Sequence, residues 1–146
     1  MRELAENLMT TTAALRRVTR RRVRETLPHP PLRVAQIELL REVEKQPGTG
    51  VAAAARSLHL AGNSVSTLVN QLVDAGLLER RVDPDDRRAA RLDLTGTARE
   101  RLANWRRTRT EFVATAVATL PAEDREAIEA ALPALGRLID ALQEER

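Results

Sequence analysis

The sequence contains no cysteine and almost no aromatic side chains. Its 146 residues include one tryptophan, one phenylalanine and no tyrosine. The lack of cysteine excludes disulfides, thiolate zinc sites and cysteine nucleophiles from this segment. A hydrophobic content of 42% is that of a globular chain, and a core of Ala, Leu and Val side chains suits packed helices better than a β-sandwich. We therefore expect a mostly α-helical protein.

Long apolar runs and common catalytic motifs are also missing. No segment approaches the roughly 18 apolar residues that a membrane span needs, and Arg2, Glu3 and Glu6 stand where a signal peptide would be apolar. These features predict a cytoplasmic protein with no membrane partner. The two histidines, His29 and His59, form no metal-binding pattern, and no HExxH helix, phosphate loop or dinucleotide fingerprint is present. The sequence predicts no enzyme activity, no catalytic residue, no metal site and no cofactor.

Positive charge is distributed unevenly, and 23 of the 24 basic residues are arginine. From Pro121 onward the chain has seven acidic residues and three arginines, a net charge of −4. The first 120 residues have 21 basic and 14 acidic residues, a net charge of +7. This asymmetry indicates that the body of the chain, and not its tail, meets a polyanion. Six arginines fall within nine residues, namely Arg16, Arg17, Arg20, Arg21, Arg22 and Arg24.

Hydrophobic periodicity, together with prolines and glycines, divides the chain into expected helices and strands. Helices are expected from the N-terminus to about Thr26, over Val34–Glu44, Val51–Leu58, Asn63–Ala75 and Thr95–Leu120, and from Pro121 onward. Two short strands are expected at Leu77–Val82 and Ala90–Leu94, and turns at Gln46–Gly50 and Leu60–Gly62. Apolar stripes at Leu4, Leu8, Thr11, Leu15 and Val18, and at Ile128, Leu132, Leu135, Ile139 and Leu142, mark the faces on which the terminal helices would pack. Pro133 is expected to bend the last helix.

The pair of short helices around Leu60–Gly62 has the helix-turn-helix pattern. The second helix combines an apolar stripe with a polar face, and Asn63 or Ser64 is its expected N-cap. A helix that enters the major groove needs such an anchored apolar face and short polar side chains near base edges. The polar face comprises Asn63, Ser64, Ser66, Thr67, Asn70 and Gln71, and the two amides are expected to pair with adenine. The alternative is an ordinary amphipathic helix whose polar face lies in water.

The expected hairpin that follows is rich in arginine. Arg80, Arg81, Arg87, Arg88 and Arg91 fall within twelve residues that otherwise read strand, loop, strand. A cationic hairpin tip suits the minor groove, where the potential of DNA is most negative. The acidic residues Asp83, Asp85 and Asp86 are expected to pair with some of these arginines and to order the loop. The alternative is a solvated charged turn.

The segments Gly76–Arg81, Asp83–Arg88 and Leu92–Thr95 closely resemble the wing signature of the multiple-antibiotic-resistance regulator (MarR) family. Gln36 with Leu39 and Leu40 is also similar to that family. The resemblance covers essentially the whole chain. It implies a mostly α (α+β) fold, with a winged helix-turn-helix, a two-stranded wing, and long terminal dimerisation helices. The implied organisation is a single domain 1–146, with a DNA-binding lobe at 33–95 and dimerisation helices at 1–30 and 96–146.

The resemblance also implies a function. It predicts an obligate homodimer that regulates transcription, a repressor that binds a pseudo-palindromic operator in double-stranded DNA and is relieved by a small anionic or aromatic effector. The alternative is a winged-helix module that binds proteins or ligands without binding DNA. The absence of charge between Asn63 and Val73 favours this alternative, and the wing arginines oppose it.

Site residues carry over position by position. Asp86 and Arg87 match a structural pair of the family's wing, and Arg88 matches the arginine suited to the minor groove. Where relatives commonly carry arginine this chain has Thr67 and Gln71, and Asn70 replaces an acid. The resulting candidates for DNA contact are Asn63, Ser64, Ser66, Thr67, Asn70, Gln71, Arg80, Arg87, Arg88, Arg91 and Arg56.

Two further expectations concern ligands and the first helix. The resemblance implies an effector site near the end of the first expected helix, and His29, Arg33 and Trp105 are the candidate contacts with the effector. Arg33 is also a candidate for neutralising a DNA phosphate. For the cluster Arg16–Arg24 the preferred interpretation is pairing with the acidic last helix of a second subunit. Contact with DNA or with an anionic effector is the alternative.

Overall fold

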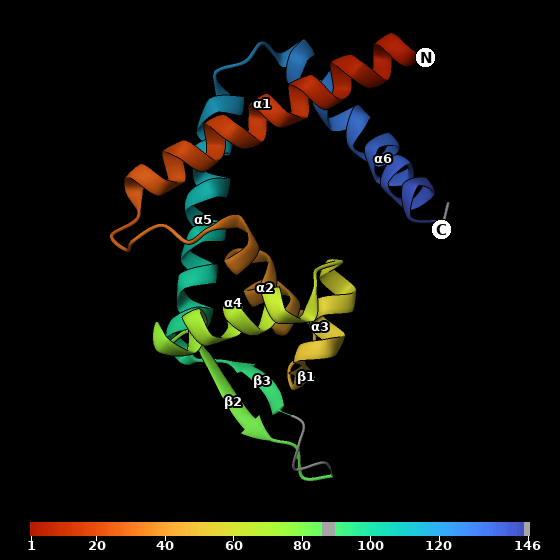
Figure 1. The fold of residues 1–146 in the computed structure, drawn as a ribbon. Coiled ribbons are helices and arrows are strands. Elements are labelled where there is room, and N and C mark those ends of the chain that lie inside the picture. Colours follow the sequence, from red (N-terminus) through yellow and green to blue (C-terminus); the bar gives the residue numbers. More distant parts are fainter. Residues whose placement is uncertain (86–89, 145–146) are drawn as a thin grey trace. The chain divides into compact units, whose positions relative to one another are not determined.

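The computed structural model describes residues 1–85 and 90–144, which form six helices and three short strands. Their order is α1 (Arg2–Thr26), α2 (Val34–Lys45), β1 (Thr49–Gly50), α3 (Val51–Leu58), α4 (Gly62–Asp74), β2 (Leu78–Val82), β3 (Ala90–Leu94), α5 (Gly96–Ala118) and α6 (Ala122–Glu144) (Figure 1). The expected mostly α winged helix-turn-helix is confirmed. Among the described residues, no helix combines the length and apolar character that crossing a bilayer requires.

The chain forms two compact units. One contains Arg24–Arg107, and the other combines Met1–Val23 with Thr108–Arg146. The expected limits of the DNA-binding lobe, 33–95, and of the dimerisation helices, 1–30 and 96–146, stay a prediction.

The unit Arg24–Arg107 has a hydrophobic core made by α2, α3, α4, the sheet and the start of α5. Apolar side chains three and four residues apart lie on one face of each helix, so the faces meet in a common interior. The buried residues are Leu39, Leu40, Val43, Ala54, Ala55, Val65, Val69, Leu72, Leu77, Leu78, Leu92, Leu94, Ala98 and Leu102. This core fixes the orientation of α4 relative to the wing, which is the hairpin of β2 and β3.

The sheet has one strand more than the sequence indicated. Its order is β1-β3-β2, and both pairings are antiparallel. The segment expected to be only a turn therefore contains β1, in which Thr49 pairs with Leu92, and the N–H of Gly48 donates to the Leu92 carbonyl at 2.9 Å. A strand of two residues is too short to show alternation, which is why the sequence did not reveal it.

The turn between α3 and α4 is built on a left-handed residue. His59 has a φ of 53°, and the N–H of Leu60 donates to the Ala55 carbonyl at 3.0 Å. This hydrogen bond closes the end of α3 as in a Schellman motif. Helix α4 then begins at Gly62, with Ala61 at the N-cap and no capping side chain. The expected N-cap at Asn63 or Ser64 is wrong, because the helix starts before either residue.

Thr95 connects the wing to α5. Its Oγ1 accepts a hydrogen bond from the N–H of Ala98 at 3.1 Å and donates to the Gly76 carbonyl at 2.8 Å. The first bond caps α5, and the second joins that cap to the turn after α4. Helix α5 accordingly starts at Gly96, one residue after the expected start.

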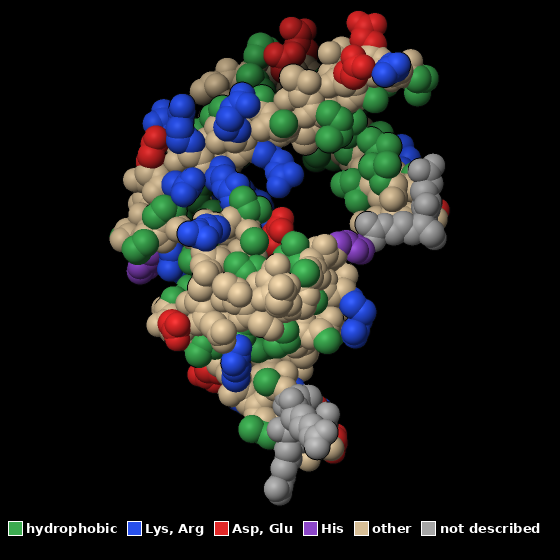
Figure 2. All heavy atoms as spheres, viewed as in Figure 1, with side chains coloured by type: hydrophobic (Ala, Val, Ile, Leu, Met, Phe, Trp, Pro, Cys, Tyr) green, Lys and Arg blue, Asp and Glu red, His purple; other side chains and the backbone are tan. Residues whose placement is uncertain are grey.

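In the other unit the apolar stripes of α1 and α6 are largely exposed. Leu8 is half-buried, whereas most other large apolar residues are between 37% and 69% exposed, and no described residue of α6 is buried. The exposed residues are Leu4, Met9, Leu15, Val18, Ile128, Leu132, Leu135, Leu138, Ile139 and Leu142. Figure 2 shows hydrophobic side chains gathered on α6. The helix continues through Pro133.

Candidate nucleic-acid interface

One face of helix α4 packs into the hydrophobic core, and the opposite face is exposed. Val65, Val69 and Leu72 are completely buried. Among the polar candidates five are exposed: Asn63, Ser64, Thr67, Asn70 and Gln71. Ser66 differs, because its side chain is half-buried and is less accessible to a base edge. The expected amphipathic arrangement is therefore present, with Ser66 at its margin.

Arg80 joins the wing to the polar face of α4. Its Nη2 donates a hydrogen bond to Oδ1 of Asn70 at 2.6 Å. Both side chains are exposed, so a guanidinium group lies on the part of the helix surface, from Asn63 to Val73, whose own residues carry no charge. This contact brings two of the sequence-predicted residues together. It also supplies the positive charge that the residues of α4 lack.

Gln71 is connected to the start of α2. The Nε2 of Gln36 donates to Oε1 of Gln71 at 3.2 Å, and the Oε1 of Gln36 accepts from the backbone N–H of Arg33 at 2.9 Å. Gln36 was not among the sequence-predicted contacts. A glutamine three residues after a helix N-cap is half of a capping box, but Arg33 does not complete that motif in the sequence.

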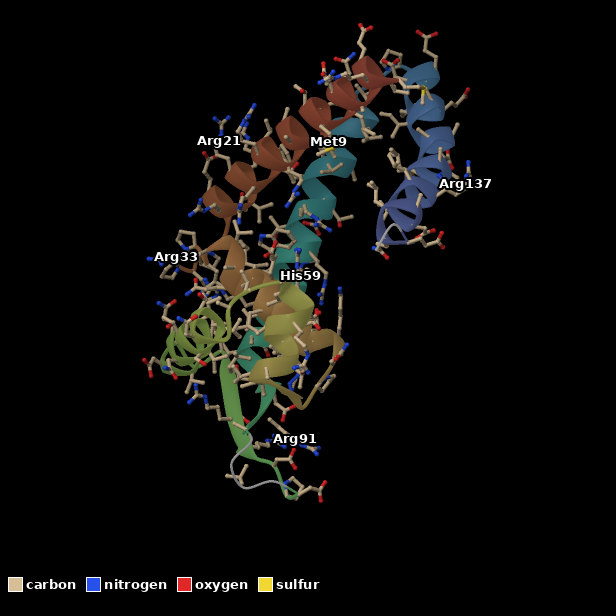
Figure 3. All side chains as sticks on the ribbon, turned by 45° about the vertical axis from the view of Figure 1, so that its right-hand side comes forward. Met9, Arg21, Arg33, His59, Arg91 and Arg137 are labelled. Atoms are coloured by element: carbon tan, nitrogen blue, oxygen red, sulfur yellow. The ribbon has the colours of Figure 1, made fainter. Side chains whose placement is uncertain are left out.

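Wing acids pair with wing arginines, as the sequence predicted for this loop. Arg91 donates to Asp83 at 2.9 and 3.3 Å and lies 3.9 Å from Asp85. The hydrogen bond to Asp83 raises the pKa of the Arg91 guanidinium, and the nearby carboxylates add to the effect. Figure 3 shows Arg91 at the wing. Arg91 therefore connects β3 to Asp83 and Asp85, which follow β2.

Arg81, on the same hairpin, is also paired. It lies 3.5 Å from both Asp93 and Glu79. The remaining wing candidates, Asp86, Arg87 and Arg88, lie outside the described residues. The expected contact between Arg88 and the minor groove stays a prediction, as does the contact of the exposed Arg56 of α3 with phosphate.

The candidate effector residues have separate surroundings. His29 and Arg33 are exposed, and Figure 3 shows Arg33 at the start of α2. Trp105 is half-buried, and the guanidinium of Arg41 lies 4.6 Å from its ring centroid. This spacing is that of a cation–π contact. An effector role for the three residues stays a prediction.

Further arginines fasten α5 to the preceding segments. Arg106 donates to both carboxylate oxygens of Glu44 at 2.6 and 3.0 Å, and Arg101 donates to the Pro30 carbonyl. The hydrogen bond from Arg106 holds the pKa of Glu44 below its usual value, whereas burial lowers the pKa of Arg101. The sequence did not reveal these contacts, because the paired residues are 62 and 71 positions apart.

The sequence model of the MarR family matches residues 31–89. Over these residues the winged helix is similar to that of the MarR family. None of the curated proteins matches the chain.

Solved structures resemble this chain over nearly its full length. A Pseudomonas aeruginosa PA01 protein assigned to the transcriptional regulators is 26% identical, with a TM-score of 0.81 and 94% of each chain covered. Streptococcus pneumoniae FabT in complex with DNA is 18% identical, with a TM-score of 0.73 and 97% of this chain and 98% of FabT covered. A mutant of S. aureus MepR bound to an oligodeoxyribonucleotide is 21% identical, with a TM-score of 0.69 and coverages of 95% and 97%.

Proposed function

We propose that this chain is a sequence-specific DNA-binding transcription regulator that acts as a homodimer on a pseudo-palindromic operator and represses transcription. The observation that carries the proposal is the hydrogen bond between Arg80 and Asn70. It joins the wing and the exposed face of α4 into one surface of amides, hydroxyls and a guanidinium. Such a surface suits base edges and phosphates. FabT and MepR, which share the fold, are bound to DNA in their structures.

The dimeric part of the proposal is supported by α1 and α6. Their large apolar side chains are exposed in the single chain, although burying them would be favourable. A second copy supplies a matching surface, because a two-fold interface brings the same patch of both subunits together. A two-fold dimer would present two α4 helices to two half-sites of opposite orientation.

Relief by an effector completes the proposal. A small anionic or aromatic ligand would bind in the unit Arg24–Arg107, with His29, Arg33 and Trp105 as candidate contacts. The cation–π contact between Arg41 and Trp105 supports this class of ligand, because it places a guanidinium beside an aromatic ring.

The proposal is tested by selecting bound duplexes from random DNA with the full chain. We expect an inverted repeat whose half-site centres lie about one helical turn apart. Affinity for the selected duplex should fall steeply with salt, because binding releases counterions from phosphates. Arg80→Gln should weaken this binding and flatten the salt slope by about one unit, whereas Arg125→Gln, which removes the same charge from α6, should change neither.

A second candidate function is a protein- or ligand-binding winged helix without DNA binding. The uncharged polar face of α4 favours it, since affinity for DNA comes largely from cations. This candidate predicts that no duplex is enriched in the selection. An enriched inverted repeat would exclude it.

A further inference from the structure

Gln71 is held by a chain of hydrogen bonds that fixes which of its amide atoms faces outward. The backbone N–H of Arg33 is only a donor, so the atom of Gln36 that faces it is Oε1, at 2.9 Å. The other amide atom of Gln36, Nε2, carries only donors and lies 3.2 Å from Gln71. Gln71 must therefore present its own oxygen to Gln36. Its NH₂ group is left for a ligand.

Asn70 is oriented in the same sense by a different partner. A guanidinium has five N–H donors and no acceptor, so the Asn70 atom that lies 2.6 Å from Arg80 is the oxygen Oδ1. The NH₂ group of Asn70 is again left for a ligand. Arg80 also keeps further N–H donors beyond the one used here. Three neighbouring side chains on the exposed surface thus offer donors, while both of their amide oxygens are engaged.

The orientation of the amides bears on which base they can read. Adenine is recognised through an amide oxygen that accepts from N6 and an amide NH₂ that donates to N7. Guanine presents two acceptors, O6 and N7, to the major groove, and donors alone satisfy both. Reading adenine would require the second lone pair of an amide oxygen that already accepts from Gln36 or from the charged Arg80. Recognition of guanine uses only the NH₂ and guanidinium donors and makes no demand on those oxygens.

On the basis of the proposed DNA-binding function, we propose that Asn70, Gln71 and Arg80 form a donor surface that selects guanine over adenine in each half-site. Gln36 is the positioning residue that sets this preference through Gln71. The pairing with adenine expected from the amides alone is replaced by recognition of guanine. The hydroxyl-bearing residues Ser64 and Thr67 accept as well as donate and do not share this restriction.

The Gln36→Glu variant tests the positioning role without altering the residue that reads the base. A carboxylate at position 36 still accepts from the N–H of Arg33 but cannot donate to Gln71. The Gln71 amide should then turn its NH₂ towards position 36 and its oxygen outward. At one base pair of each half-site we expect the guanine preference to change by about tenfold towards adenine or cytosine, whose amino groups donate. The measurement is competitive binding of duplexes that differ only at that base pair.

Two further variants complete the experiment. Gln71→Glu places an acceptor outward directly and should change the preference in the same direction, so the test does not depend on the folding of the Gln36 variant. Gln143→Glu adds the same charge to the exposed end of α6 and should leave the base preference unchanged.

The outcomes separate this inference from the proposed function. Selection of adenine by the unaltered protein would overturn the inference while DNA binding stands. A guanine preference that survives both Gln36→Glu and Gln71→Glu would overturn it equally. Failure of the unaltered protein to enrich any duplex would overturn the proposed function, and the inference with it.

Discussion

Arg106 and Glu44 show at the scale of single residues how the structure uses its many arginines. They form a bidentate ion pair between α5 and α2, and both side chains are partly exposed. The hydrogen bond from Arg106 lowers the pKa of Glu44 in the folded chain. Because the folded pKa lies below the unfolded one, the pair stabilises the fold at neutral pH. This stabilisation is lost as the pH falls from about 4.5 through the folded value.

We therefore expect Glu44→Gln to lower the free energy of unfolding at pH 7 by about 0.2–1 kcal/mol, the range of solvent-screened pairs. Below the pKa of folded Glu44 the difference between variant and unaltered protein should disappear. Urea unfolding at pH 7 and over a series of lower pH values measures both quantities. Glu38→Gln removes an exposed carboxylate from the same helix and serves as the control. A difference that does not diminish as the pH is lowered would contradict the assigned role of the ion pair.

Individual contacts were the part of the site least accessible from the sequence. The polar face of α4 follows from periodicity, so Asn70 and Gln71 were predicted correctly as exposed. Their partners Gln36 and Arg80 are 35 and 10 positions away in the sequence, and no local pattern links the pairs. The orientation of the amides depends on those partners. For that reason the sequence alone suggested adenine, and the proposed preference for guanine rests on these hydrogen bonds.

At the scale of elements, one hydroxyl group joins the start of α5 to the turn that follows α4. Thr95 closes the first turn of α5 and holds the Gly76 carbonyl. We expect Thr95→Val to lower the free energy of unfolding by about 0.5–2 kcal/mol, because the cap is lost while the shape of the side chain is kept. Thermal unfolding measures the effect. Thr97→Val, at an exposed position in the same turn, should cost less than the Thr95 variant; equal losses would contradict the capping role.

The accuracy of the predicted element boundaries differs between elements. Helices α1, α2 and α3 were predicted to within about a residue, because their apolar stripes end at proline or glycine turns. Strand β1 was missed, since its pairing with β3 depends on chain distant in sequence. The N-cap of α4 was placed too late in the sequence because Ala61, a residue without a capping side chain, occupies that position. A tertiary contact decided the first case, and the absence of a local capping signal decided the second.

The arginine cluster of α1 lies mostly away from the apolar stripe of that helix. At about 100° per residue, Arg16, Arg20 and Arg24 fall on the side opposite Leu4 and Leu15. Figure 2 shows basic side chains gathered around the second half of α1. Pairing of the cluster with the acidic α6 of a second subunit, or its contact with DNA or an effector, stays a prediction.

At the scale of the whole molecule, the exposed apolar residues of α6 lead to a prediction about assembly. Leu132 is 58% exposed in the single chain, so the proposed dimer would bury it. We expect Leu132→Asp to convert the dimer to monomers at micromolar concentration, because a carboxylate is strongly disfavoured in an apolar interface. Sedimentation measures the change. Ala130→Asp adds the same charge to an exposed position away from the stripe and should leave the dimer intact.

DNA binding should change together with assembly. A monomer engages one half-site without the gain in effective concentration that a second linked α4 provides. The Leu132→Asp variant should therefore bind the inverted repeat no better than an isolated half-site. An unaltered protein that sediments as a monomer would contradict the proposed dimer directly.

The strand order of the sheet also bears on aggregation through the edges of the sheet in concentrated solution. Because β3 lies between the others, β2 is an open edge of five residues that could pair with the edge of another molecule. Charged side chains at Glu79, Arg80 and Arg81 occupy this edge, beside the exposed Val82. Charges on an edge strand oppose such pairing. We therefore expect neutral apolar replacements of the wing arginines to reduce the colloidal stability of the protein even where they leave the fold unchanged.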